Sequence, residues 1–254
     1  MIYVLEDQGS RDYMEDRHYI ALKFFMDYDL YCIFDGHGND SIAKYLHLYF
    51  KDVLRNSLLS EEFETVQGMV QGFQNAFKTM HNTIPVSIGM NAGSTALVIL
   101  QNSQEIWVAN VGDCRAVMVK ETSSTPMSID HKPSLKSEYD RIVAIPGGFV
   151  AHDPMGTARV NGNLAVSRSF GDFSLSPMVT WVPDVFNFKI PPDYKFSFIA
   201  SDGVYDVIST EEIYHLFAPY SLDDHESVKT ACHKVLDTAR SRGSGDNITI
   251  IIRK

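Results

Sequence analysis

The fold is decided by the stretch Leu30-Tyr31-Cys32-Ile33-Phe34-Asp35-Gly36-His37, an apolar run that stops at an Asp-Gly pair. A short apolar run bounded by a turn signal is typical of a buried strand. The β-rich segment His18 to Phe25 precedes it, and the turn-like residues 26–29 join the two. Segments 18–25 and 30–34 are therefore predicted to form a hairpin.

Beyond Asp40 the spacing of the apolar residues changes to that of helices. Positions 42, 46, 49, 50 and 53 are apolar and fall on one stripe of an amphipathic helix. A second stripe runs from Val66 to Met80, and Ser60 with the two glutamates after it is its expected N-terminus. Two helices are thus predicted to follow two strands.

Three more strands are expected next, over Ser94 to Leu100, Glu105 to Val111 and Arg115 to Lys120. They are rich in β-branched and aromatic residues, and the links between them are short. Because strands joined by such short links run antiparallel, these three are predicted to form a meander.

The remaining residues continue this pattern of strands and helices. Expected elements are a helix over 134–145, strand-like pieces at 160, 164–166 and 182–188, a strand over 196–200, a helix opened by the capping box 209–212, the longest helix over 222–242 with Gly243 at its end, and a strand over 248–252. Strands in runs and helices in pairs predict an α+β fold with antiparallel sheets covered by helices. No linker or repeat divides the chain, so residues 1–254 are predicted to be one domain.

Composition excludes several classes of protein. The 22 Lys and Arg against 32 Asp and Glu argue against a nucleic-acid or anionic-lipid partner. No apolar run reaches the roughly 18 residues of a membrane span. The three cysteines are few, odd in number and far apart, so no disulfide framework is implied. With no signal peptide at the acidic N-terminus, we expect an intracellular protein, cytoplasmic or nuclear, and a monomer.

Carboxylates recur beside glycines at the ends of the apolar strands, in Asp35-Gly36, Gly112-Asp113, Asp202-Gly203 and Gly245-Asp246. Glu15-Asp16, just before the first predicted strand, adds two more acidic groups. Clustered carboxylates repel one another and need a cation, and Mg²⁺ or Mn²⁺ prefers such oxygen ligands. Asp-Gly is also the common turn dipeptide, so the pattern alone leaves both a turn and a cation site open.

Ten short motifs follow one another along the chain: Arg11-x-x-x-Glu15-Asp16, Phe34-Asp35-Gly36-His37-Gly38, Gly93-Ser94-Thr95-Ala96, Asn110-Val111-Gly112-Asp113-Cys114-Arg115, Asp130-His131-Lys132-Pro133, Gly147-Gly148, Arg159-Val160-Asn161-Gly162, residues 164–172 (LAVSRSFGD), Ser201-Asp202-Gly203 and Gly245-Asp246-Asn247. With these motifs the chain resembles, from about residue 9 to residue 252, the metal-dependent serine/threonine protein phosphatases of the protein phosphatase 2C type. Each motif is weak by itself, whereas ten of them in order are specific. The resemblance implies a four-layer α-β-β-α sandwich of two antiparallel sheets flanked by pairs of helices.

The resemblance also implies a site with two Mg²⁺ or Mn²⁺ ions. Asp35 would bridge both ions, with the carbonyl of Gly36 and the side chain of Glu15 at one of them. Asp202 and Asp246 would complete the other ion's site.

The remaining members of the implied site act around these ions. Asp16 would lie nearby and act through water, and Asp113 would hold a weaker third ion together with Asp202. Arg11 would bind the substrate phosphate as a bidentate clamp, and His37 would be the general acid.

The implied reaction is hydrolysis of phosphoserine and phosphothreonine on proteins. The two ions would activate a bridging water for in-line attack on phosphorus, without a covalent intermediate. Structural packing is expected for all three cysteines, so no thiolate nucleophile is predicted. Arg168 is expected to have a structural role, holding carboxylates such as Asp172.

Two alternatives to this hypothesis remain open. The chain could be a catalytically inactive member of the fold that acts as a binding partner. It could also be a two-metal phosphoesterase for small molecules.

Overall fold

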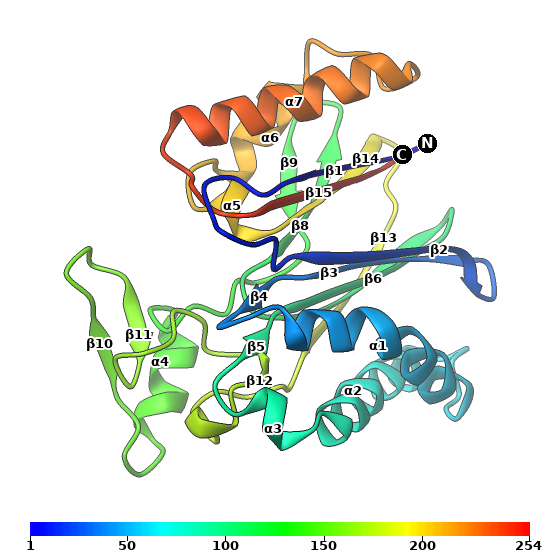
Figure 1. Cartoon of the computed structure of the whole chain (residues 1–254). Coiled ribbons are helices and arrows are strands. Elements are labelled where there is room, and N and C mark those ends of the chain that lie inside the picture. Colours follow the sequence, from blue (N-terminus) through cyan, green and yellow to red (C-terminus); the bar gives the residue numbers. More distant parts are fainter.

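The computed structural model describes residues 1–254 and contains two five-stranded antiparallel sheets stacked face to face (Figure 1). The upper sheet has the order β1 (Ile2–Asp7), β15 (Ile248–Arg253), β14 (Tyr194–Ala200), β8 (Arg115–Lys120) and β9 (Ser124–Pro126). The lower sheet has the order β13 (Asp184–Lys189), β7 (Glu105–Val111), β6 (Ala96–Gln101), β3 (Tyr28–Phe34) and β2 (Arg17–Phe25).

Helices cover the outer face of each sheet (Figure 1). Below the lower sheet lie α1 (Ser41–Leu59), α2 (Val66–Thr83) and the short α3 (Val86–Gly89). The upper sheet is covered by α5 (Asp202–Tyr205), α6 (Thr210–Phe217) and α7 (His225–Ser241). The four-layer α-β-β-α arrangement and the α+β class are thus confirmed.

Smaller elements complete the chain beside this sandwich. They are a three-stranded sheet of β12 (Phe170–Gly171), β5 (Gly93–Ser94) and β4 (Gly36–His37), the helix α4 (Lys136–Val143), the hairpin of β10 (Val150–His152) and β11 (Ala158–Val160), and a 3-10 turn at Phe173–Leu175. None of the helices combines the length and the hydropathy that crossing a bilayer requires.

Strand β3 shows why the decisive stretch is apolar at every position. Successive side chains of a strand point to opposite faces. Leu30, Cys32 and Phe34 accordingly pack in the core between the lower sheet and its helices. Tyr31 and Ile33 pack in the core between the two sheets. Both faces of β3 are therefore buried from Leu30 to Phe34, which explains the apolar run.

The predicted meander is wrong at its third strand. Strands β6 and β7 pair antiparallel, as expected. However, β8 pairs with β14 of the upper sheet and not with β7. The link at Gly112 crosses from one sheet to the other, and Gly112 has φ +102°, where a Cβ atom would collide with Thr95. A short link can therefore join strands of two stacked sheets, and not only the two strands of a hairpin.

Strand β1 is absent from the sequence prediction. It pairs along its whole length with β15, from Ile2 opposite Arg253 to Asp7 opposite Ile248. Residues 2–5 are β-formers, but the only partner of β1 is at the other end of the chain, so no neighbouring hairpin indicates the pairing. The strand brings the two ends of the chain together (Figure 1).

Two helix boundaries also differ from the expected ones. Helix α1 continues to Leu59, so Ser60 ends α1 and does not begin α2. Thr65 is the N-cap of α2, and its side chain accepts a hydrogen bond from the backbone N–H of Gly68. Asp224 caps α7, and with 17 residues α7 is shorter than the 19-residue α1.

The capping box of α6 and the glycine end of α7 are confirmed. Ser209 and Glu212 exchange side-chain to backbone hydrogen bonds at the start of α6. Gly243 follows α7 with φ +93°. Residues 164–166 form no strand, although Leu164 makes an isolated bridge to Val160.

Candidate metal centre

Three of the predicted ligands meet at one edge of the stacked sheets. Asp35 directly follows β3 of the lower sheet, and Asp202 follows β14 of the upper sheet. Asp113 lies in the link between β7 and β8 that joins the two sheets. One oxygen from each of these three carboxylates lies within 4.8 Å of the other two. The fold therefore gathers oxygen ligands from distant parts of the sequence.

The negative charge of this cluster is only partly compensated, because Asp113 alone among the three carboxylates forms an ion pair. Burial raises the pKa of Asp35 well above its ordinary value, and the charges of Asp16, Asp202 and Asp113 raise it further. Burial and the charge of Asp113 likewise raise the pKa of Asp202. No hydrogen bond or ion pair engages the carboxylate of Asp35 or Asp202. A divalent cation would relieve this repulsion.

Lys132 is the nearest cation to the cluster, and no role in the site was expected for it. Its ammonium lies 3.3 Å from a carboxylate oxygen of Asp113 and 2.7 Å from one of Asp206. Burial raises the pKa of Asp113, and Lys132 opposes that rise. Lys132 comes from the Asp-His-Lys-Pro motif, which is one of the motifs of the family resemblance and also fits a turn before a helix. Its contact with Asp113 depends on the packing of two distant loops.

Asp16 and Glu15 lie beside the cluster, on the segment before β2. The buried carboxylate of Asp16 accepts hydrogen bonds of 2.8 Å from the hydroxyls of Ser201 and Thr249. Burial nevertheless raises the pKa of Asp16 to about 6. Burial also raises the pKa of Glu15, whose backbone N–H donates to the Asn247 side chain at 2.7 Å.

Gly36 is a glycine for a steric reason. A Cβ atom at this position would lie 2.8 Å from the backbone oxygen of Glu15 and 3.1 Å from the Cβ of Ala43. The absence of a side chain lets the segment before β2 approach the chain next to Asp35. The predicted neighbours Glu15 and Gly36 are thus brought together.

Asp246 lies outside the group of three carboxylates, although its charge contributes to the raised pKa values of Asp35 and Asp202. The structure pairs it with Arg11, whose Nη2 lies 2.6 Å from a carboxylate oxygen of Asp246. The Arg11 side chain is 56% exposed. Arg11, the predicted phosphate clamp, therefore lies at the site, where its guanidinium binds Asp246, a predicted metal ligand.

His37 forms a hydrogen bond that the motif did not indicate. Its Nε2 lies 2.7 Å from Oδ2 of Asp172, and the hydroxyl of Ser169 donates to the same oxygen. Asp172 is buried and has φ +48°. The predicted general acid thus has a carboxylate to orient its ring.

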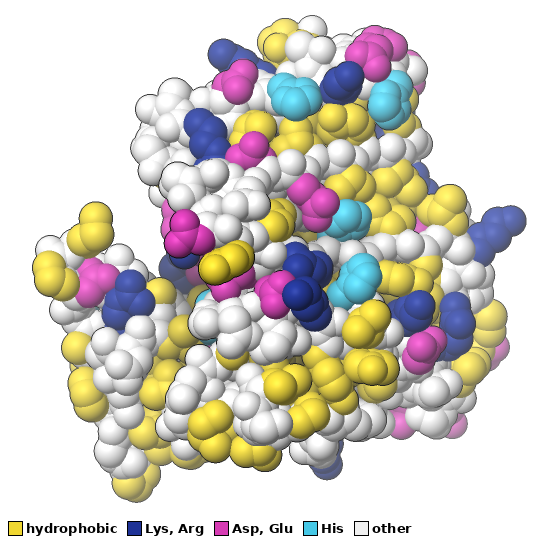
Figure 2. Space-filling model, in the orientation of Figure 1, with side chains coloured by type: hydrophobic (Ala, Val, Ile, Leu, Met, Phe, Trp, Pro, Cys, Tyr) yellow, Lys and Arg dark blue, Asp and Glu magenta, His cyan; other side chains and the backbone are white.

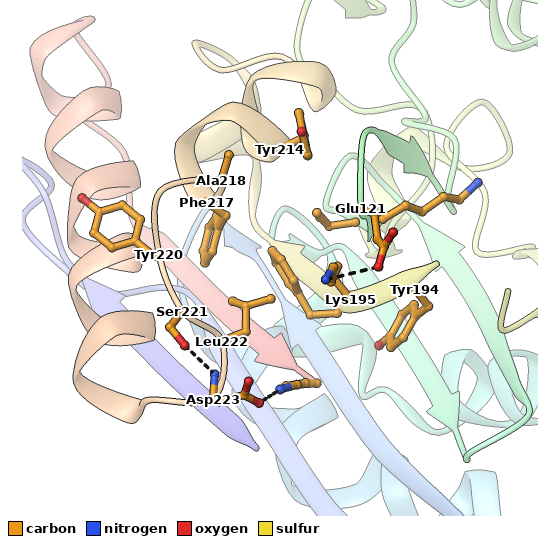
Figure 3. A pocket seen from close by; sticks show the side chains of 14 residues that line it. Glu121, Tyr194, Lys195, Tyr214, Phe217, Ala218, Tyr220, Ser221, Leu222 and Asp223 are labelled. Carbon is orange, nitrogen blue, oxygen red and sulfur yellow. Dashed lines mark hydrogen bonds and ion pairs between the residues drawn. The ribbon is translucent and has the colours of Figure 1, made fainter. Parts of the chain in front are cut away.

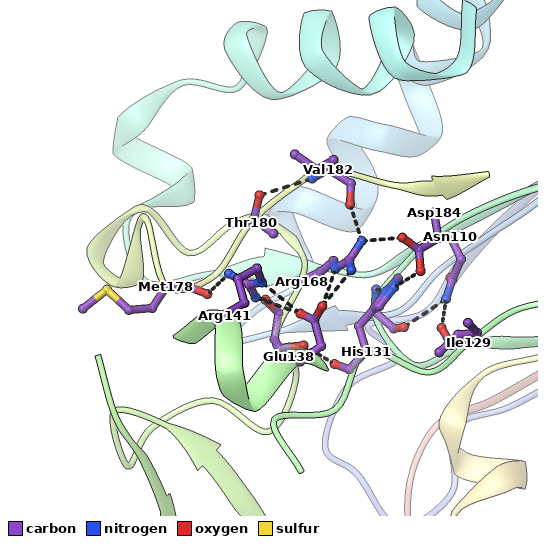
Figure 4. Close-up of polar contacts among 12 residues, drawn as sticks. Asn110, Ile129, His131, Glu138, Arg141, Arg168, Met178, Thr180, Val182 and Asp184 are labelled. Atoms are coloured by element: carbon purple, nitrogen blue, oxygen red, sulfur yellow. Dashed lines mark hydrogen bonds and ion pairs between the residues drawn. The ribbon is translucent and has the colours of Figure 1, made fainter. Parts of the chain in front are cut away.

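Arg168 is structural, as expected, but its partners differ from the expected Asp172. The guanidinium binds Glu138 at 2.7 Å and Asp184 at 2.8 Å (Figure 4). Arg141 binds the other oxygen of Glu138 at 2.8 Å. Asp172 pairs with His37, so the expected contact between Arg168 and Asp172 is wrong. These residues come from α4, from the segment before β12 and from the first position of β13, and the ion pairs hold those parts together.

Buried His131 joins this network to the loop that carries Asp113 (Figure 4). Its Nδ1 accepts a hydrogen bond from the backbone N–H of Gly112 at 3.1 Å. The proton of the neutral ring is therefore on Nε2, which lies 3.1 Å from Oδ2 of Asp184. The His131 side chain consequently helps to fix the loop that carries Asp113, by binding the backbone N–H of Gly112.

The cysteines are buried and carry no thiolate. Burial raises the pKa of Cys32 and Cys114 above the ordinary value and that of Cys232 to about 12. Only Cys114 lies next to the cluster, where its sulfur is 3.2 Å from the hydroxyl oxygen of Thr95. Their expected place in the packed interior is confirmed.

A surface pocket of about 540 Å³ contains none of the candidate ligands (Figure 3). It lies between α6, the loop after it and the ends of β8 and β14. Tyr194, at one end of β14, lines it, whereas Asp202 follows the other end of that strand. On the face shown in Figure 2, Lys and Arg side chains are scattered among acidic ones.

Comparison with known proteins identifies the family of the chain. The family model "Protein phosphatase 2C" matches residues 3–248. The chain belongs to the protein phosphatase 2C family. Protein phosphatase 1L of Bos taurus is 32% identical to it over 268 residues, covering 100% of this chain and 72% of that protein. Protein phosphatase 2C homolog 2 of Schizosaccharomyces pombe is also 32% identical, covering 96% of this chain and 70% of that protein.

The fold is shared with solved structures. Serine-threonine phosphatase 2C from Toxoplasma gondii superposes with a TM-score of 0.81 at 22% identity, covering 99% of this chain and 93% of that one. Membership of the protein phosphatase 2C family places the chain in the class of metal-dependent protein serine/threonine phosphatases. The resemblance found in the sequence motifs is confirmed.

Proposed function

We propose that this protein removes phosphate from phosphoserine and phosphothreonine in proteins, using two divalent ions held by its acidic cluster. The observation that carries the proposal is the meeting of Asp35, Asp113 and Asp202 within 4.8 Å. Family membership supports the reaction class, and the cluster supports the use of a metal.

The donor set fits Mg²⁺ or Mn²⁺. These ions take oxygen ligands, and the cluster offers carboxylates without nitrogen or sulfur. Burial and neighbouring carboxylates raise the pKa values of Asp35 and Asp202, and neither carboxylate forms an ion pair. We propose that Asp35 serves both ions, with Glu15 and the Gly36 carbonyl on one side and Asp202 and Asp246 on the other. Asp16 would act through water, and Asp113 would hold a third, weaker ion.

When bound, such ions lower the pKa of water and neutralise charge on phosphoryl oxygens. The side chains of this chain supply the remaining tasks. Arg11 offers a partly exposed guanidinium that can leave Asp246 and bind a phosphoryl oxygen. His37, oriented by Asp172, can deliver a proton to the departing oxygen of the substrate side chain.

We also make proposals for the domain organisation, the oligomeric state and the compartment of the enzyme. We propose one catalytic domain over residues 1–254, because a shared core joins the two sheets. We also propose that the protein is a monomer. An intracellular site of action is proposed because the three buried cysteines are free thiols.

The decisive experiment measures phosphate release from a phosphothreonine peptide with added Mn²⁺. We expect turnover by the unaltered protein and a loss of at least about a hundredfold in Asp202→Ala. Asp237→Asn, a change at an exposed aspartate of α7 that forms no ion pair, is the matched control and should retain full activity. No turnover with Mn²⁺, or turnover undiminished by Asp202→Ala, would refute the proposal.

A second arm of the experiment distinguishes proteins from small molecules as substrates. The same protein is assayed with ATP and with glucose 6-phosphate at matched concentrations. We expect the phosphopeptide to have the higher kcat/KM. A higher kcat/KM for either small molecule would favour a small-molecule phosphoesterase.

A further inference from the structure

Arg240 lies outside every motif that indicated the site, yet its side chain reaches the backbone beside a candidate metal ligand. It belongs to the last turn of α7. Its Nη1 donates hydrogen bonds of 2.8 Å to the backbone oxygens of Ser244 and Asp246. Its Nη2 forms an ion pair with Asp7. One guanidinium thus binds a helix end to two separate segments.

The second of these segments leads to Arg11. Asp7 is the last residue of β1 and also accepts a hydrogen bond of 2.9 Å from the backbone N–H of Gly9. Gly9 has φ +67°, and a Cβ atom there would collide with the oxygen of Asp246 and with the guanidinium of Arg240. The turn that presents Arg11 is therefore packed directly on Arg240.

A further contact joins the same two segments. The backbone N–H and the hydroxyl of Ser10 both donate to the backbone oxygen of Gly245, at 3.0 and 2.9 Å. Segments 7–11 and 244–246 are thus bound to each other, and the guanidinium of Arg240 contacts both of them. Moving either segment would break hydrogen bonds to the other.

Arg240 differs from Arg11 in that it does not bind the carboxylate of Asp246. Arg11 binds the carboxylate of Asp246, which is the group a metal ion would need. Arg240 binds only the backbone oxygen of Asp246. It can therefore hold Asp246 in place without competing with an ion for the carboxylate.

We propose that Arg240 is a positioning residue that fixes the backbone of Asp246, and the turn carrying Arg11, for metal binding. This inference rests on the proposed function, since it takes Asp246 as a ligand. The planar fork of arginine reaches three acceptors at once, whereas lysine offers a single charged point. Residues that orient a ligand typically change metal affinity 10- to 100-fold when they are lost.

The test is a Mn²⁺ titration of the purified protein, in which free Mn²⁺ is followed by electron paramagnetic resonance. We expect Arg240→Gln to weaken the binding of one ion about tenfold. Arg242→Gln is the matched control, because Arg242 caps the same helix but binds Val207 and Glu212. The control should change the affinity less than twofold. Equal affinity in Arg240→Gln and the unaltered protein would overturn the inference.

Activity separates a positioning role from general loss of structure. In Arg240→Gln the Mn²⁺ concentration for half-maximal activity should rise about tenfold, while kcat at saturating Mn²⁺ stays within about twofold. A lower kcat with an unchanged Mn²⁺ requirement would contradict positioning. Arg240→Lys retains the charge and should give an intermediate affinity. Full affinity in Arg240→Lys would mean that the fork is unnecessary and would also contradict the inference.

Asp246→Asn distinguishes failure of this inference from failure of the proposed function. If Asp246→Asn binds Mn²⁺ as the unaltered protein does, Asp246 is not a ligand and both proposals fail at this position. If Asp246→Asn weakens binding and Arg240→Gln does not, only the role of Arg240 is refuted.

Discussion

A carboxylate oxygen of Asp35 lies within 4.8 Å of one from Asp202, although the two residues follow strands of different sheets. Their separation is set by the core between the sheets, where Ile33 of β3 and Ile199 of β14 are both fully buried. The acidic cluster therefore exists only when the sheets are packed, and its repulsion opposes that packing in the absence of a cation.

This repulsion predicts that Asp35→Asn stabilises the metal-free protein. A carboxylate with a raised folded-state pKa destabilises the fold when it is ionised, so removing its charge should raise the free energy of unfolding by roughly 1 kcal/mol, or about 2–4 °C in Tm. Mn²⁺ should raise the Tm of the unaltered protein but not that of the variant. Thermal scans with chelator and with Mn²⁺ measure both effects. A lower Tm for metal-free Asp35→Asn would contradict the argument.

The contact between His37 and Asp172 predicts a dependence on the leaving group. His37→Gln should slow hydrolysis of a phosphothreonine peptide about a hundredfold, because the departing alkoxide needs a proton. Para-nitrophenyl phosphate has a good leaving group and should lose much less. Steady-state kinetics on both substrates decide the matter. Equal losses would remove the acid role of His37.

Arg11→Ala should act mainly on substrate binding. Removing the guanidinium should raise KM for the phosphopeptide about tenfold with little change in kcat, provided the clamp acts equally on substrate and transition state. Arg159→Ala, which breaks an ion pair with Asp153 in the β10–β11 hairpin, serves as control. An unchanged KM in Arg11→Ala would be evidence against a phosphate clamp.

The ion pairs of Glu138 predict a pH-dependent contribution to stability. Burial by itself would raise the pKa of Glu138, but Arg168 and Arg141 outweigh it and bring the pKa to about 2. A depressed pKa stabilises the fold above the unfolded value of 4.5, and this contribution is lost as pH falls towards 2. Glu138→Gln should therefore lower the stability at pH 7 and differ less from the unaltered protein near pH 3. Urea unfolding at several pH values measures the difference; a constant gap would contradict it.

The core between the sheets should tolerate truncation poorly. Ile199→Ala removes a fully buried side chain and should cost about 2–5 kcal/mol in unfolding free energy. Leu22→Ala, at a residue that is 62% exposed, should cost less than about 0.5 kcal/mol. Denaturant unfolding of both variants checks the prediction. Similar costs at the two positions would argue against the described packing.

Elements with strong local signals were predictable. The apolar run before Asp35 and the stripe of α2 identify their own structures, because burial of one or both faces dictates the residue period. The capping box at Ser209 likewise sets the start of α6 from four adjacent residues. Strand β1 was not predicted. Its only partner is β15, at the other end of the chain, and no local pattern indicates that pairing.

The site divides in the same way. The acidic residues and glycines could be picked out because their types and order match a known set of motifs. The contacts of Lys132 with Asp113 and of Asp172 with His37 could not, since each joins loops far apart along the chain. The prediction of Asp172 as the partner of Arg168 is wrong for the same reason. Several carboxylates lie near Arg168 along the sequence, and only the packing brings Glu138 and Asp184 to it.

The amino-acid sequence by itself determined most of the strands and helices, though not β1, as well as the acidic character of the strand ends and the family of this protein. These depend on residue type and on spacing within short segments. Tertiary structure alone decided that β8 leaves the meander for the upper sheet, that Arg11 pairs with Asp246, and that Arg240 binds the backbone oxygens of Ser244 and Asp246 together with the carboxylate of Asp7. Such contacts depend on distances between parts of the chain that only the packing of the two sheets sets.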